Sequence, residues 1–192
     1  MNLLTTDEGE MTVRLARAAI EYAIVKKPKP AISQTPVFSD KRGIFVTLTK
    51  AGELRGCIGF PYPVIPLGDA IEDAAVAAAT GDPRFPPVRK EELSSIRLEV
   101  TILTDPIPVV GEPGKRPEKI DVGRHGLIVR GRGTSGLLLP QVATEYGWDS
   151  TTFLDHTCIK AGLPGRCWTF ANVEVLTFEG QIFTEPFMRA AV

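Results

Sequence analysis

The stretch LRGCIGF, from Leu54 to Phe60, places an arginine and a cysteine two residues apart among glycines, within a pattern otherwise typical of a buried strand. Core strands favour branched apolar residues, and a glycine inside a strand weakens it unless a backbone, a ligand or a partner must come close. The stretch therefore serves either close packing or chemistry, and the surrounding sequence is needed to weigh the two.

Residues on both sides of this stretch predict a β-hairpin followed by a helix. Gly43 to Thr49 and Glu53 to Gly59 flank the sequence KAG, and two strands around a glycine-bearing turn are typical of a hairpin. Pro66 then stands where a helix would begin, and an alanine-rich apolar stripe runs from Leu67 to Ala78 before Gly81. The small side chains of that stripe indicate a helix packed closely against a sheet.

An amphipathic helix is predicted toward the N-terminus, where apolar residues recur at steps of three and four. The pattern runs from Met11 to Val25, with Asp7 as the expected N-terminal cap. Lys27 to Pro36 is rich in proline and predicts an extended connection to the hairpin.

The second half of the chain begins with a strand and a long irregular segment. Ile96 to Ile102 alternate apolar and polar residues, which is typical of a half-buried strand. Thr104 to Ile120 is broken by prolines and glycines and predicts a long surface loop and a lobe boundary. The elements expected after it are a hairpin, two short helices opened by Pro140 and Asp149, and a final strand pair: Leu127 to Arg130 with Gly136 to Leu139, and Val173 to Phe178 with Gln181 to Phe183.

This order of elements shows no regular βαβ repetition and therefore favours an α+β fold, with a mixed or mostly antiparallel sheet flanked by helices. The length of residues 1–192 is that of one domain. This domain could consist of two interleaved lobes, with the long loop near 104–120.

Composition limits the classes of protein that remain. The formal net charge of −1 disfavours nucleic-acid binding by bulk electrostatics. No apolar run approaches membrane-spanning length, and the first ten residues are acidic where a secretory signal would be basic, so we expect a cytoplasmic protein. The three cysteines, Cys57, Cys158 and Cys167, form no CxxC pair, which predicts reduced thiols.

Six segments in order carry a resemblance to a known family. They are GIFVTL, GELRGCIGF, DPRFPPV, GRHGLIV, GLLLPQVATEYGW and FLDHTCIKAGLP. Together they resemble the AMMECR family, also called AmmeMemoRadiSam system protein A, whose central signature LRGCIG is present from Leu54 to Gly59. The resemblance implies a two-lobed α+β fold with a smaller β-containing lobe, and a cleft between the lobes that gathers the motif residues. It also implies an association with a Memo-like protein and a radical-SAM protein, and it names no biochemical activity or cofactor.

The motif residues allow two interpretations. In a strand, Arg55 and Cys57 would share a face while Leu54 and Ile58 enter the core. A guanidinium beside a thiol favours the thiolate, so Cys57 could be a nucleophile or redox thiol, with Gly56 and Gly59 forming the floor of a pocket. Alternatively, Cys57 is a small buried hydrophobe, Arg55 pairs with a carboxylate across the sheet, and the glycines allow a helix to pack tightly.

A cysteine nucleophile usually needs a base. His125, between two glycines, is the better candidate because a position between loop and strand could direct it into a cleft; the alternative is a turn histidine that bonds the backbone. His156 lies on a predicted helix, two residues from Cys158 and on a different face, so we expect a structural or surface role.

Other charged residues are candidates for substrate binding. Asp82 and Arg84 lie just beyond a predicted helix end, and Arg84 could join Arg55 and Arg124 in holding a carboxylate or phosphate. Arg84 could instead stabilise the helix carbonyls. No pair of His and Cys residues has the short spacing of zinc ligands, so no metal site is expected.

Two functions follow as competing hypotheses. In the first, the chain is an enzyme with Cys57 and His125 as catalytic residues, and with Arg55, Gly56, Gly59, Asp82 and Arg84 around a small anionic substrate. In the second, it is a non-catalytic binding or adaptor protein that receives a protein segment from the Memo-like or radical-SAM partner.

Overall fold

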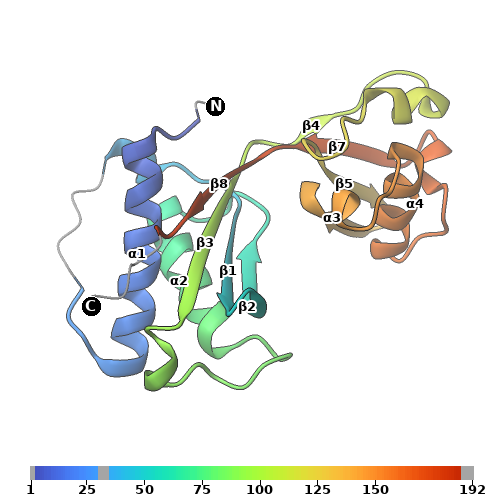
Figure 1. Cartoon of the computed structure of the whole chain (residues 1–192). Helices are drawn as coiled ribbons and strands as arrows, with labels where there is room; N and C mark the ends of the chain where they lie inside the picture. Colours follow the sequence, from blue (N-terminus) through green and yellow to red (C-terminus); the bar gives the residue numbers. More distant parts are fainter. Residues whose placement is uncertain (1–2, 30–34, 187–192) are drawn as a thin grey trace. The chain divides into compact units, whose positions relative to one another are not determined.

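A computed structural model of the chain describes residues 3–29 and 35–186 (Figure 1). The chain divides into two compact units. The first unit combines the residues up to Leu103 with those from Gln181 onward, and the second unit is Thr104–Gly180. Half of the extended connection predicted over Lys27 to Pro36 falls on residues 30–34, which lie outside the described residues.

The first unit is built on a four-stranded sheet in the order β2-β1-β3-β8. Strand β1 (Ile44–Lys50) pairs antiparallel with β2 (Glu53–Phe60) on one side and with β3 (Ile96–Leu103) on the other. Strand β8 (Gly180–Thr184) lies next to β3. The predicted first hairpin is confirmed, and its strand β2 is an edge of the sheet.

The hairpin turn follows from two residues with positive φ. Ala51 has a φ of 51° and Gly52 a φ of 85°. A two-residue turn of this kind has the twist that matches an antiparallel strand pair. Glycine adopts such a φ without strain, which is why KAG connects the strands.

Helices α1 (Thr6–Val25) and α2 (Leu67–Thr80) belong to the first unit and share one hydrophobic core with its sheet. A capping box opens α1: the Thr5 hydroxyl accepts a hydrogen bond from the Glu8 N–H, and the Glu8 carboxylate accepts one from the Thr5 N–H. The prediction that Asp7 caps this helix is therefore wrong, because Asp7 already lies in the first turn.

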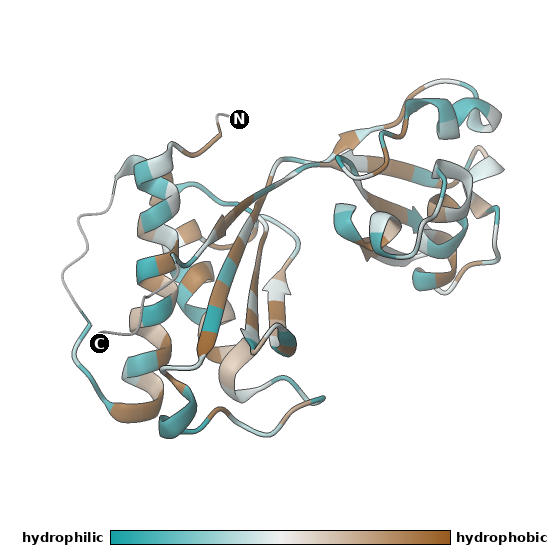
Figure 2. Cartoon of the chain, viewed as in Figure 1, coloured by the Kyte–Doolittle hydropathy of each residue, from teal (hydrophilic) through white to brown (hydrophobic). Residues whose placement is uncertain are grey.

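The core of the first unit lies between these helices and one face of the sheet. Ile44, Val46 and Leu48 of β1 are completely buried, as are Ala70 and Ala74 among the small residues of α2. Figure 2 shows apolar and polar residues alternating along β3 and around α1. Because alternate residues of a strand point to opposite faces, the residues between the buried ones face away from both helices.

The second unit has its own four-stranded sheet, in the order β4-β7-β5-β6. Neighbouring strands in this sheet run antiparallel. Its buried residues include Leu127 and Val129 of the sheet and Phe153 and Leu154 of a helix. The elements are β4 (Ile107–Pro108), β5 (Gly126–Gly131), β6 (Thr134–Leu138), α3 (Pro140–Glu145), α4 (Ser150–Lys160) and β7 (Glu174–Phe178).

Short 3-10 helices complete both units. They are η1 (Pro36–Ser39), η2 (Lys90–Glu92), η3 (Pro113–Lys119) and η4 (Cys167–Thr169). The segment predicted as a long loop, Thr104 to Ile120, contains β4 and η3 and begins the second unit. None of the described helices is long and apolar enough to cross a membrane.

Two sequence predictions are wrong: the pairing of the last two strands and the state of two cysteines. Strands β7 and β8 do not form a pair, because β7 lies between β4 and β5 while β8 joins β3 in the other sheet. Cys158 and Cys167 are joined by a disulfide, although reduced thiols were expected. Their Cα atoms lie 5.8 Å apart because the chain turns back between α4 and η4, a proximity that a spacing of nine residues does not reveal.

Candidate functional site

The candidate site is a row of three side chains on the sheet face that points away from α1 and α2. In the register of the sheet, Thr47 of β1 is opposite Cys57 of β2 on one side and opposite Glu99 of β3 on the other. Cross-strand partners project to the same face, so the three side chains form one line across the sheet. We call this line, Cys57, Thr47 and Glu99, the thiol row.

Cys57 is the free cysteine of the chain, since Cys158 and Cys167 are bonded to each other. It is half-buried, and its sulfur accepts a hydrogen bond from the Thr47 hydroxyl at 3.3 Å. A hydrogen bond donated to sulfur stabilises the thiolate more than the neutral thiol. The row therefore offers a partly accessible sulfur beside a donor that favours its reactive form.

Glu99 supplies the titratable group at the other end of the row. Burial raises the pKa of its carboxyl above the ordinary value, which favours the protonated acid. Within the part of the chain that the structure describes, no hydrogen bond or ion pair to this carboxyl is present. The backbones that carry Glu99 and Cys57 are two strand spacings apart, roughly 10 Å, and the longer Glu99 side chain can reach toward the sulfur over Thr47, so a substrate lying across Thr47 could meet both groups.

Asp82 and Arg84 lie at the edge of the sheet beside Cys57. The carboxylate of Asp82 accepts a hydrogen bond from the Cys57 N–H at 2.9 Å. Arg84 pairs with this carboxylate through a 2.7 Å bond and also donates to the Cys57 carbonyl oxygen at 3.4 Å. These two candidate residues thus gather around Cys57, and both are engaged with the protein's own groups.

Arg55 is directed elsewhere by an irregularity in β2. The pairing changes from Leu48 with Gly56 to Thr49 with Leu54, so Arg55 is the extra residue of a β-bulge and the alternation of β2 is interrupted there. Leu54 is consequently 41% exposed, and the expectation that it enters the core is wrong.

The guanidinium of Arg55 binds both carboxylate oxygens of Glu92 at 3.1 Å, and Lys50 joins the same carboxylate at 3.0 Å. The hydrogen bonds from Arg55 foremost, then those from the Arg89 backbone and Lys50, lower the pKa of Glu92 to about 2. The side chain of Arg55 is only 12% exposed. Arg55 thus pairs with a carboxylate, as the packing interpretation of the motif proposed, and the anion-holding role remains a prediction.

The motif glycines are places of close packing. A Cβ atom at Gly56 would lie 2.2 Å from the Ala78 carbonyl oxygen of α2, and one at Gly59 would lie 2.2 Å from the Ile44 carbonyl oxygen. Backbone atoms of neighbouring elements fill the space that a side chain would need. Gly56 therefore admits a helix against the strand and does not open a pocket there.

His125 lies in the second unit. Its Nδ1 accepts a hydrogen bond from the Asp121 N–H at 3.0 Å, and the neighbouring Arg124 forms a 2.9 Å ion pair with Glu179. The backbone bond of His125 is the arrangement expected of a turn histidine, and its pairing with Cys57 stays a prediction. The other histidine, His156, stacks on Trp148 with ring centroids 3.9 Å apart.

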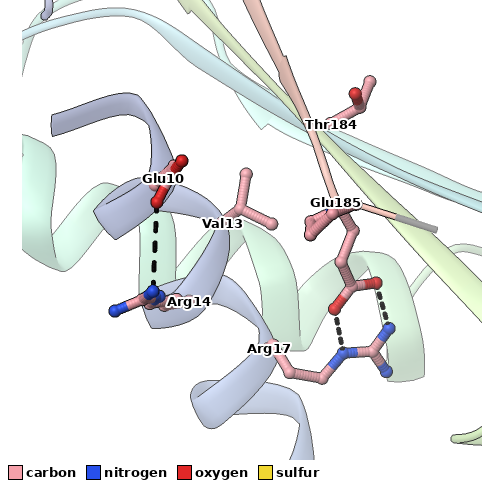
Figure 3. A pocket seen from close by; sticks show the side chains of 7 residues that line it. Glu10, Val13, Arg14, Arg17, Thr184 and Glu185 are labelled. Carbon is pink, nitrogen blue, oxygen red and sulfur yellow. Dashed lines mark hydrogen bonds and ion pairs between the residues drawn. The ribbon is translucent and has the colours of Figure 1, made fainter. Parts of the chain in front are cut away.

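A separate groove of about 330 Å³ lies between α1 and the end of β8 (Figure 3). Arg17 forms two hydrogen bonds with Glu185 there, at 2.8 and 2.5 Å, and Arg14 pairs with Glu10 at 3.9 Å. None of the residues proposed from the sequence lines this groove. Because its charged groups are bound to one another, the thiol row remains the stronger candidate.

Thr47, Glu99 and Glu92 are the residues that the sequence analysis missed. All three required the strand register or the position of η2, neither of which is visible in a single sequence. The one available signal was Glu99 itself, a carboxylate at one of the polar positions of a strand that alternates apolar and polar residues. Among the described residues, no cluster of three or more His, Cys, Asp or Glu side chains could hold a metal ion.

The fold and the site together define an α+β protein with two antiparallel sheets, one of which carries a free thiol and a protonatable carboxylate on the same face. Residues 13–183 match the AMMECR1 family, and the chain belongs to that family. The resemblance noted in the sequence is thereby confirmed.

Relatives of similar length share the fold. The chain is 54% identical over 188 residues to Protein Mbar_A1807 of Methanosarcina barkeri, covering 95% of this chain and 93% of that protein. It is 50% identical over 195 residues to Protein MJ0810 of Methanocaldococcus jannaschii, covering 100% and 97%. The crystal structure of the uncharacterised protein PH0010 from Pyrococcus horikoshii matches with a TM-score of 0.86 at 47% identity, covering 95% of this chain and 94% of that one. These names state no activity.

Proposed function

We propose that the chain is an enzyme that uses Cys57 as a nucleophile toward an electrophilic carbonyl carbon, with Glu99 as the proton donor. The observation that carries the proposal is the thiol row: a half-buried free sulfur, a hydroxyl 3.3 Å from it, and a carboxyl whose pKa is raised by burial. A thiol nucleophile and an acid on one face of a sheet are an arrangement typical of covalent catalysis.

The chemistry assigned to the row is acyl transfer to the thiol. The Cys57 thiol gives its proton to solvent, and the thiolate attacks the carbonyl carbon of an ester or thioester, forming a carbon–sulfur bond. The bond to the leaving group breaks, and that group takes the proton of Glu99. Water then hydrolyses the enzyme thioester, which releases the acid and restores the thiol, while Glu99 regains a proton from solvent.

Thr47 stabilises the sulfur during both steps. Its hydroxyl lies between the strands that carry the other two groups, and it donates to the sulfur. The N–H of Cys57 is already bonded to Asp82, so the negative oxygen of the intermediate must receive its hydrogen bonds from another donor.

The experiment uses p-nitrophenyl acetate and ethyl thioacetate as probes. We expect one acetyl group per chain on Cys57, measured by intact mass and located by peptide mapping. The leaving group should be released in a burst of the same size. Cys57→Ser should lose the burst. Glu99→Gln should slow acylation by the thioester more than by the nitrophenyl ester, because nitrophenolate leaves without a proton.

The result that would overturn the proposal is the absence of acetylation at Cys57 in the folded wild type with both probes. In that case the second hypothesis, a binding protein without its own chemistry, would account better for the same surface.

A further inference from the structure

The edge of β2 is closed at one residue by two side chains. As an edge strand, β2 presents backbone groups on its outer side that no other strand pairs. At Cys57 the outer N–H donates to the Asp82 carboxylate at 2.9 Å, and the outer carbonyl accepts from Arg84 at 3.4 Å. Asp82 and Arg84 therefore hold both backbone groups of the residue that carries the nucleophile, as a fifth strand would.

The two side chains are bonded to each other, and we call the pair the edge clamp. Arg84 donates to the two Asp82 oxygens through Nε at 3.0 Å and through its terminal nitrogen at 2.7 Å, and its backbone N–H adds a bond at 3.1 Å. The Asp82 side chain is only 2% exposed. The hydrogen bond from Arg84, ahead of those from the Cys57 and Arg84 backbones, holds the pKa of Asp82 well below its usual range. The clamp thus stays charged and fixed at neutral pH.

Arg84 is also the cation bonded to the residue that carries the sulfur. The pKa of its guanidinium is raised first by the hydrogen bond to Asp82, and the negative charges of Asp82 and of a Cys57 thiolate raise it further. Arg55, the arginine of the sequence motif, is instead bonded to Glu92 through Nε and one terminal nitrogen. The sequence motif suggested Arg55 as the positive charge beside Cys57, but the cation bonded to this residue is Arg84, from the segment after α2.

We propose that Asp82 and Arg84 are positioning residues for Cys57: Asp82 fixes its backbone at the open sheet edge, and Arg84 stabilises its thiolate. This inference rests on the proposed nucleophilic role of Cys57. It assigns the sequence DPR, directly after α2, to the preparation of the nucleophile and not to direct binding of the substrate.

The first test compares the pH profiles of Cys57 alkylation by iodoacetamide in four forms of the full chain: wild type, Arg84→Gln, Arg84→Lys and Arg55→Gln. Arg84→Gln should move the midpoint of the profile upward by about one pH unit, and Arg84→Lys should restore most of that shift. Arg55→Gln should leave the midpoint in place. Circular dichroism and thermal unfolding verify that each variant is folded.

The second test measures hydrogen exchange at the Cys57 amide. Asp82→Ala should accelerate this exchange at least about tenfold, since the amide loses its acceptor, while amides bonded between β1 and β2 keep their protection. An Asp82→Asn variant, which retains an oxygen acceptor, serves as the version that keeps the fold if the alanine variant does not.

An unchanged midpoint in Arg84→Gln, an equal shift in Arg55→Gln, or unchanged exchange in a folded Asp82→Ala would each overturn the inference. Failure of the proposed function has a different signature, because it is read in the wild type alone. If wild-type Cys57 reacts readily but its alkylation profile is unchanged in Arg84→Gln, the role of the edge clamp is contradicted and the proposed nucleophile is not. A wild-type Cys57 that is never acylated removes the nucleophile.

Discussion

The hydroxyl of Thr47 donates a hydrogen bond to the sulfur of Cys57 across the β1–β2 pair, at 3.3 Å. This contact joins the signature strand to its neighbour on the face that α1 and α2 leave open. Thr47→Val should remove the donor and reduce the rate of Cys57 alkylation at pH 7 about three- to tenfold, the equivalent of one neutral hydrogen bond. Thr47→Ser should retain the wild-type rate. Equal rates in the valine and serine variants would show that the hydroxyl does not act on the sulfur.

Glu99 should lower the stability of the protein at neutral pH. Because burial raises the folded-state pKa of this carboxyl above the unfolded value of 4.5, its protonated form favours folding, and that contribution is lost as pH rises through the folded pKa. Glu99→Gln should therefore raise the Tm at pH 7 by about 2 °C or more, with the difference from wild type disappearing below pH 4.5. A glutamine variant that is less stable at pH 7 would contradict this account.

Glu92 should show the opposite pH dependence. Its pKa is lowered from 4.5 to about 2, foremost by Arg55, so its stabilising contribution is complete above 4.5 and is lost as pH falls toward 2. Glu92→Gln should reduce the free energy of unfolding at pH 7 by about 1 to 3 kcal/mol, measured by urea denaturation. The two proteins should converge over the same acidic range. If the difference in the free energy of unfolding stayed constant across that range, the ion pair of Glu92 would not be the cause of the stability loss.

Gly56 should tolerate no side chain. Alanine there would place its Cβ atom 2.2 Å from the Ala78 carbonyl oxygen, and α2 must move to accept it. We expect Gly56→Ala to lower the free energy of unfolding by about 1 to 3 kcal/mol. Gly114→Ala is the matched control, because no atom lies within 4 Å of the added Cβ. Equal stability of the two variants would mean that the strand and helix are not tightly packed.

Local sequence patterns predicted the elements well because each depends on neighbouring residues. The KAG turn, the alanine stripe after Pro66 and the Asp149 cap all specify their structure within a few positions, and the structure shows each of them. The family resemblance, carried by six separate segments, was also readable from the sequence.

Long-range pairing was not readable in the same way. The last two strands are separated only by Glu179, yet they join different sheets, because β8 returns to the unit in which the chain began. The disulfide of Cys158 depends likewise on a reversal of direction that no spacing rule marks.

The candidate site was predicted in part. Cys57, Asp82 and Arg84 were singled out from their residue types, and the structure brings the three together. The assumption that failed was strict alternation along β2, which one extra residue interrupts near Arg55. Thr47 and Glu99 enter the site only through the strand register.

The central claim, that Cys57 is an activated thiol, is tested most directly by the pH dependence of its alkylation in the folded wild type. Under non-reducing conditions Cys158 and Cys167 are bonded to each other, so iodoacetamide should label one cysteine per chain. The account predicts labelling of native Cys57 with a midpoint clearly below the value of about 8.5 for free cysteine. If Cys57 is labelled only after the protein unfolds, it is a packing residue and the claim is contradicted.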